Sequence, residues 1–251
     1  MTDRAVTEIV GFILVFSLVL GTVSIVYVGG FAELQDTRDF EKVQNAERAF
    51  DVLSTNLRGV AQGDAPSRAT EIKLSDASLR TGEPTFITIN TTGMNSSAAA
   101  TRPITYQPSD SDSTVIYEAG SVIRADGDSA QMVSRPDFVF GPNQTVIRVI
   151  ELRGGKQSVG GDTTTLVRSE RRFQEIRHQH QNESQQINVT IRVEPASGHA
   201  EAWRRYLDDA LTAAYDTPTH DCSIQGSEVV CTDVMTNSMY FAATGIDIEL
   251  V

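Results

Sequence analysis

The chain opens with MTDRAVTEIVGFILVFSLVLGTVSIVYVGG, residues 1–30, and this stretch decides how the protein is organised. An uncharged, mostly apolar run occupies residues 9–28. As a helix, this run would be roughly 30 Å long, which is enough to cross the hydrocarbon core of a bilayer. The sequence therefore predicts a membrane helix over residues 9–28.

Three kinds of N-terminal segment fit this opening. A secretory signal peptide would be removed after the apolar run, near Gly29 and Gly30, although the run is long for such a peptide. An uncleaved single-pass anchor would need no processing at all. A prepilin-type, class III signal peptide would be cut before the apolar run, so that the helix stays in the mature protein.

The sequence RAVTEIVG of residues 4–11 resembles the start of archaeal type IV pilins. The resemblance implies that a prepilin peptidase cuts between Ala5 and Val6, which leaves residues 1–5 as a leader. One residue departs from the pattern, because Glu8 stands where many archaeal pilins have Pro. The helix and the body that follow are similar to a haloarchaeal pilin-like family without an assigned function.

Four residues at the start of the helix are candidates for contacts between subunits. A carboxylate at the edge of the hydrocarbon, Glu8, needs a partner or water, and the new α-amino group of Val6 could pair with it. Gly11, Ser17 and Gly21 are small residues that let helices approach closely. We expect the helix to associate with further copies of the chain or with other pilin subunits.

An amphipathic pattern extends the helix beyond the apolar run. Apolar residues recur with alternating spacings of three and four, at Val43, Ala46, Phe50, Leu53, Leu57 and Val60. Gly63 and Pro66 then end the pattern. We expect an N-terminal transmembrane and assembly helix over residues 6–62 and an exported head domain over residues 67–251.

The head is predicted to be β-rich, which makes the chain an α+β protein. Its short alternating or β-branched runs are separated by Gly, Pro, Asn and Asp, as in antiparallel sandwiches and barrels. These runs are residues 71–74, 85–89, 113–117, 121–124, 138–140, 145–152, 186–193, 229–234 and 245–251. One short helix, capped by Ser197 and packed through Trp203, interrupts the strands. Residues 91–112 are predicted to form a long surface excursion.

The charge balance is acidic, with 33 acidic and 21 basic residues and a formal net charge of −12. Only three of the basic residues are lysines: Lys42, Lys73 and Lys156. Such a surface stays hydrated at high salt, so together with the N-terminal resemblance it favours a halophilic archaeon. It also argues against nucleic acid as a partner, since phosphate binding needs clustered cations.

Cys222 and Cys231 are the two cysteines, and Gly226 lies midway between them. This spacing predicts a β-hairpin closed by a disulfide, which suits an oxidising exterior. Free thiols and a metal site are the alternatives. The metal site is disfavoured because only His220 lies nearby in the sequence, so a fourth ligand is missing.

Asn-X-Ser/Thr sequons occur only beyond the apolar helix, as an exported head would require. The acceptor residues are Asn90, Asn95, Asn143, Asn182 and Asn188. Arg4 on the short N-terminal side fits a cytoplasmic N-terminus before processing and a head outside the cell membrane.

Motifs that would carry catalysis are missing from the sequence. The serines form no G-x-S-x-G elbow, and the glycine-rich stretch around Lys156 lacks the spacing of a phosphate-binding loop. His178 and His180 would share a face of a strand, but their polar neighbours favour an exposed strand over a metal site. We expect no enzymatic activity and no cofactor.

The sequence therefore predicts a pilin-like structural subunit of an archaeal cell-surface filament, assembled through its N-terminal helix. The alternative is a single-pass surface protein that never polymerises and whose head binds glycan, envelope material or another protein.

Overall fold

The structure is a computed structural model, and it describes residues 2–92, 94–180, 186–217 and 219–251. Within these, the side chains of residues 2–9, 28–39, 94 and 95 are not described. The chain divides into two compact units, residues 1–42 and 43–251. The helices are α1 (Thr2–Gln62) and α2 (Ala200–Ala214).

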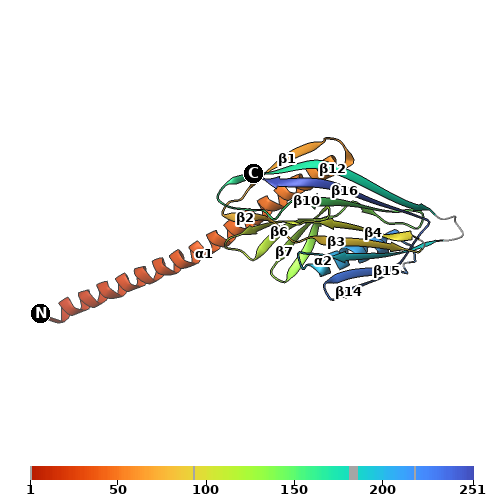
Figure 1. Cartoon of the computed structure of the whole chain (residues 1–251). Coiled ribbons are helices and arrows are strands. Elements are labelled where there is room, and N and C mark those ends of the chain that lie inside the picture. Colours follow the sequence, from red (N-terminus) through yellow and green to blue (C-terminus); the bar gives the residue numbers. More distant parts are fainter. Residues whose placement is uncertain (1, 93, 181–185, 218) are drawn as a thin grey trace. The chain divides into compact units, whose positions relative to one another are not determined.

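Sixteen strands complete the described part of the chain (Figure 1). They are β1 (Ser67–Lys73), β2 (Ala77–Thr81), β3 (Thr85–Thr91), β4 (Met94–Thr101), β5 (Ile104–Pro108), β6 (Ser113–Glu118), β7 (Ser121–Asp126), β8 (Ser129–Ser134), β9 (Phe138–Val139), β10 (Thr145–Arg153), β11 (Ser158–Gly161), β12 (Thr164–His180), β13 (Ile187–Glu194), β14 (Asp221–Gln225), β15 (Glu228–Thr236) and β16 (Ser238–Leu250).

The strands form three sheets. The first has the order β1-β12-β16-β10-β9, the second β11-β2-β5-β6-β7-β8, and the third β14-β15-β13-β3-β4. The pairs are antiparallel except β10 with β16, which run parallel from Thr145↔Met239 to Arg153↔Asp247. The predicted sheet-rich α+β fold is confirmed.

The larger unit begins inside α1, at Val43, rather than after the helix. The six apolar residues that recur with spacings of three and four are all at most 3% exposed. They pack against the first and second sheets, on residues such as Leu152, Ile246, Leu79 and Tyr106. Residues 43–62 therefore belong to the head, because their apolar stripe forms part of its hydrophobic core.

The C-terminal end of α1 is set by glycine. Gly63 has φ +93°, and the amides of Gly63 and Asp64 both donate to the carbonyl of Gly59, at 3.1 and 3.0 Å. This left-handed cap satisfies backbone carbonyls that the last turn leaves unpaired. The chain then turns at Pro66 into β1.

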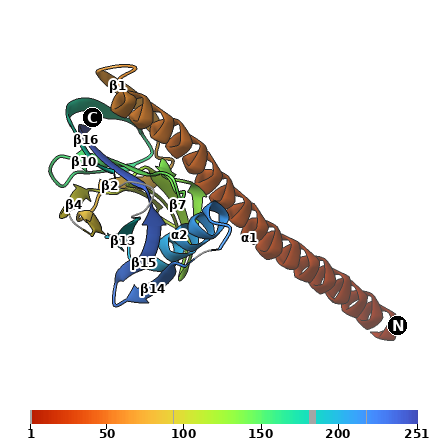
Figure 2. The same ribbon diagram turned by 90° about the vertical axis from the view of Figure 1, so that its right-hand side faces the viewer.

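A second core lies beneath one face of α2, which contacts β13, β14, β15 and β8 (Figures 1 and 2). Trp203 and Leu207 are fully buried there, together with Ile191 and Val229 of the third sheet and Ile123 of the second. The predicted core role of Trp203 is confirmed, and it follows from the apolar stripe on this face of the helix.

Two expectations about local structure are wrong. Residues 91–112 contain β4 and β5 and include the buried Ile104 and Tyr106. Their many Ser, Thr and Ala residues are small strand residues, so polar composition hid the alternation. Ser197 is not the cap of α2: His199 takes that position without a side-chain hydrogen bond, and Ser197 bonds elsewhere.

Candidate functional site

The apolar segment of α1 is the first candidate site. The window Val10–Tyr27 has a mean hydropathy of 2.4, and none of it is buried within the chain. Ile25, Val26 and Phe12 are 75%, 73% and 70% exposed. By length and composition the segment is able to cross a membrane, and a signal sequence near the N-terminus would share these properties.

Two hydroxyl groups inside this segment bond to backbone carbonyls of the helix itself. Thr22 Oγ1 donates to the carbonyl of Val19 at 2.9 Å, and Ser24 Oγ donates to the carbonyl of Leu20 at 2.8 Å. In hydrocarbon an unpaired hydroxyl would be costly, so these internal bonds make the segment compatible with lipid.

Small residues lie on the surface of the same segment. A Cβ added at Gly11 or Gly21 would meet no atom within 4 Å, and Ser17 is exposed. Packing inside the described part of the chain therefore does not explain these glycines. The other predicted residues of this region, Ala5, Val6 and Glu8, have helical backbone, but their side chains lie outside the described residues.

A buried carboxylate is the second notable feature. Glu118 is 0% exposed at the end of β6, just before a turn in which Ala119 and Gly120 both have positive φ. Trp203 Nε1 donates to its Oε2 at 2.8 Å, and Ser197 Oγ donates to the same oxygen at 3.2 Å.

The other oxygen of Glu118, Oε1, accepts from Thr85 Oγ1, which in turn accepts from the amide of Ala196 at 2.9 Å. The carboxylate thus ties the second sheet to β3 and to the start of α2. Burial lowers the pKa of the neighbouring His199, and the Glu118 carboxylate acts in the opposite direction. With both oxygens occupied and no exposure, Glu118 is placed to hold the fold rather than to react.

Sequence reasoning missed Glu118 because a glutamate next to Ala-Gly reads as a solvated turn residue. A weak signal was available. A buried Trp needs an acceptor for its indole N–H, so a core Trp203 implies a buried polar partner somewhere in the chain.

The hairpin of β14 and β15 carries the disulfide. Cys222 lies directly opposite Cys231 in the register, and the two sulfurs are bonded at 2.04 Å. Gly226, with φ +67°, lies in the turn. The predicted disulfide-closed hairpin is confirmed, because local alternation and a central glycine are enough to specify it.

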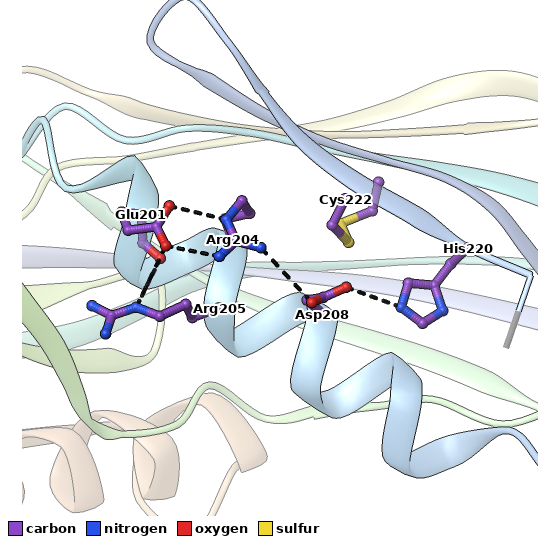
Figure 3. A network of polar contacts seen from close by, with 7 residues as sticks. Glu201, Arg204, Arg205, Asp208, His220 and Cys222 are labelled. Atoms are coloured by element: carbon purple, nitrogen blue, oxygen red, sulfur yellow. Dashed lines mark hydrogen bonds and ion pairs between the residues drawn. A yellow bond between two sulfur atoms is a disulfide. The ribbon is translucent and has the colours of Figure 1, made fainter.

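A network of ion pairs on α2 lies next to this disulfide (Figure 3). Arg204 contacts Glu201 at 2.8 Å and Asp208 at 3.7 Å, and Asp208 Oδ1 lies 3.3 Å from His220 Nε2. Donor atoms of Asp208, His220 and Cys222 all lie within 4.8 Å of one another.

The His220 side chain is largely enclosed in this cluster. Its side chain is 5% exposed, and its Nδ1 has no hydrogen-bond partner among the residues that the structure describes. Asp208 is a potential metal ligand that the sequence did not predict, because it lies on α2, whereas His220 directly precedes β14 and Cys222 lies in it. The sequence disfavoured a metal site because Asp208, a possible fourth ligand, is not near the cysteines in the sequence.

The predicted sequons occupy different environments. Asn143 is exposed in the turn before β10, whereas Asn90 is half-buried in β3. Asn188 is half-buried in β13, and its side-chain amide donates to a carboxylate of β15 at 2.9 Å. The side chain of Asn95 and the whole of Asn182 lie outside the described residues.

The two histidines of β12 are exposed, as expected from their polar neighbours. The His178 ring stacks on the Tyr240 ring, with 3.9 Å between the centroids. The centroids of the His178 and His180 rings are 6.3 Å apart. His178 Nε2 also lies 3.1 Å from Ser238 Oγ. Within the described ranges, no third ligating side chain joins them.

Comparisons with known proteins match the chain to a family that has no assigned function. A family model described as "Family of unknown function (DUF7289)" matches residues 4–249. An uncharacterized protein of Archaeoglobus fulgidus is 31% identical over 87 residues, which is 34% of this chain and only 28% of that protein's length. No solved structure is significantly similar to the chain.

Proposed function

The chain belongs to this family of unknown function, and we propose that it is a pilin-like subunit of an archaeal cell-surface filament. In this proposal a prepilin peptidase cuts between Ala5 and Val6, and residues 9–28 hold the chain in the membrane until it assembles. The head lies outside the cell, and its role is structural rather than enzymatic.

The observation that carries the proposal is the bare apolar segment Val10–Tyr27. It exposes large apolar side chains all round the helix, which is far more apolar surface than a soluble monomer leaves in water. The segment therefore needs lipid or other helices as its surroundings. A pilin-like subunit uses both in turn, lipid before assembly and neighbouring helices afterwards.

The open glycines support assembly over simple anchoring. Gly11 and Gly21 leave room at the helix surface that nothing in the described part of the chain fills. Where helices pack in an apolar medium, such small residues let backbones approach closely. Cleavage before Val6 would leave this whole surface in the mature protein.

The deciding experiment is mass spectrometry of the N-terminus of the native, membrane- or filament-associated protein. We expect the mature chain to start at Val6. An Ala5→Leu variant should keep its leader and drop out of sheared filament preparations, while a Thr2→Ala variant, altered inside the leader, should be processed normally. An intact N-terminus at Met1 or Thr2 would overturn the proposal.

Glu8 favours a second candidate, because it departs from the pilin pattern. The chain would then be an uncleaved single-pass surface protein whose head binds glycan, envelope material or another protein. Both candidates predict membrane retention, so fractionation alone does not separate them. Presence of the chain in filaments released by shearing distinguishes the first from the second.

A further inference from the structure

We propose that the reduced form of the β14–β15 hairpin binds one Zn²⁺ through Cys222, Cys231, His220 and Asp208. The site is built at the corner where α2 meets the hairpin, which Figure 3 shows in close-up. It is distinct from the apolar segment and needs no filament, so it stands or falls independently of the proposed function.

The donors already lie close to one another in the disulfide form. One donor atom each of Asp208, His220 and Cys222 lies within 4.8 Å of the other two, and Cys231 is bonded to Cys222. Tetrahedral zinc, with bonds of about 2.0–2.3 Å, holds its donors roughly 3–4 Å apart. The cysteines are opposite each other in the register, so separating their sulfurs requires side-chain rotation and no change of strand pairing.

Burial favours a metal over solvent at this corner. The Cys231 side chain is fully buried, and the His220 side chain is 5% exposed, with one ring nitrogen that has no hydrogen-bond partner among the described residues. A buried nitrogen without a partner costs stability unless something binds the ring or reorients it. Asp208 is 44% exposed, which leaves the ion a route from water.

The donor set selects the metal. Two thiolates, an imidazole and a carboxylate suit zinc, whereas magnesium and calcium prefer oxygen donors alone. Arg204, 3.7 Å from Asp208, offsets part of the excess negative charge of the ligands. Its other contact, Glu201, holds the guanidinium in place along α2.

Zinc and the disulfide exclude each other. A cellular dithiol reductant breaks the sulfur–sulfur bond by exchange, giving two cysteine thiols and the cyclic disulfide of the reductant. Both thiols then lose their protons to water as the two sulfurs bind the ion. Zinc would therefore occupy the corner in a reducing compartment. Exchange with the cyclic disulfide form of the reductant would re-form the Cys222–Cys231 bond and release the ion, while the reductant takes up the two electrons and, from water, two protons.

The test uses the full-length chain in detergent micelles. A phosphine reduces the disulfide: the phosphine becomes its oxide by taking the oxygen of water, and the two thiols take the protons. Co²⁺ serves as the spectroscopic probe. We expect one Co²⁺ per reduced chain, with a thiolate-to-cobalt charge-transfer band that Zn²⁺ abolishes. The oxidised chain should show no band.

Matched variants test the ligands one at a time. Asp208→Asn and His220→Gln should each weaken metal binding by about tenfold or more, consistent with the loss of a protein ligand. Asp209→Asn, which changes the exposed neighbour on the same helix, should leave the affinity unchanged. Equal affinity in all three variants would overturn the four-ligand site and leave the cysteines alone as the binding groups.

A measurement on the wild type guards against variants that fail to fold. Zn²⁺ should raise the Tm of the reduced chain and leave that of the oxidised chain unchanged, because the metal binds the folded corner. A reduced chain whose Tm does not respond to Zn²⁺, or that shows no cobalt band, refutes the site.

Discussion

The two ends of α1 have the same secondary structure, but one leaves its apolar residues exposed and the other buries them. Residues 10–27 are apolar on every side, and none of that window is buried within the chain. Residues 43–60 carry one apolar stripe, whose six members are all at most 3% exposed. The stripe packs into the core of the head, whereas the apolar segment has no burial against the described part of the chain.

This difference shows that helix periodicity and burial are separate pieces of information. A stripe with spacings of three and four specifies a partner on one side, and here two sheets supply it. A helix that is apolar on all faces does not indicate which face is buried, so it is surrounded on all sides by lipid or by other helices. The comparison can be tested by changes that should affect only one of the two regions.

The largest effect is expected from charges in the apolar segment. Leu14→Arg with Leu18→Arg replaces two side chains that are each 65% exposed. Each arginine near the middle of a membrane helix costs about 2.5–3.5 kcal/mol of insertion free energy, so the pair costs roughly 5–7 kcal/mol. We expect the double variant to leave the membrane fraction, as measured by fractionation and immunoblotting.

The matched control is Leu14→Ile with Leu18→Ile, which keeps the segment apolar and should remain in the membrane. Thermal unfolding of the head should be unchanged in both double variants. A head destabilised by the arginines would show that residues 10–27 contribute to its core, and the comparison between the two regions would be wrong.

The next effect concerns the stripe. Leu53 is 1% exposed, while its neighbour Val52 is 54% exposed. Leu53→Ala should lower the free energy of unfolding by about 2–5 kcal/mol, because it leaves a cavity between α1 and the sheets. Denaturant unfolding measures the loss, and membrane retention should not change.

Val52→Ala is the control on the adjacent residue and should change the free energy of unfolding by roughly 0.5 kcal/mol or less. Equal losses in the two variants would mean that residues 43–60 are not packed as described.

A smaller loss is expected at the buried carboxylate. Glu118→Gln keeps the volume but replaces an acceptor oxygen with an N–H₂ donor that faces the donors of Trp203, Ser197 or Thr85. We expect the free energy of unfolding to fall by about 1–3 kcal/mol, with weakened docking of α2 seen in Trp203 fluorescence. The control, Glu194→Gln at an exposed position, should leave the free energy of unfolding unchanged. If Glu118→Gln also leaves it unchanged, the Glu118 carboxylate does not stabilise the head.

The smallest effect is expected at the ion pair between α1 and the second sheet. Glu47 and Arg124 are 3.0 Å apart, and each side chain is 19% exposed. Glu47→Gln should lower the free energy of unfolding by about 1 kcal/mol or less, because water screens part of the attraction. Glu41→Gln, exposed on the same helix, is the control. A loss as large as that of Leu53→Ala would mean that charge rather than apolar packing holds residues 43–62 in the head.

Local patterns predicted a large share of the fold. The apolar run, the stripe, the helix end at Gly63, the short strands and the disulfide hairpin each depend on residues close together in sequence. The order of the three sheets and the parallel pairing of β10 with β16 could not be predicted in the same way. They depend on which strands meet after folding, and strands of similar composition are interchangeable at the level of sequence.

The candidate sites divide along the same line. The apolar segment and the cysteine pair were visible in the sequence, while Glu118 and Asp208 were not. Both missed residues are carboxylates whose partners lie on other elements, 85 residues away for Glu118 and Trp203 and 12 for Asp208 and His220. A carboxylate usually lies in water, so only its tertiary neighbours reveal that it is buried or that it faces a potential metal ligand.

The sequence by itself determined that this protein has an apolar helix able to cross a membrane, a helical stripe that needs a core, and a hairpin closed by a disulfide. Hydrophobic periodicity and cysteine spacing are enough for these features because each depends on residues that are close together in the sequence. Only the tertiary structure decided that residues 43–62 belong to the head, that Glu118 joins two sheets to α2, and that Asp208 lies close to His220 and Cys222. These features arise from contacts between distant segments, and such contacts exist only once the chain has folded.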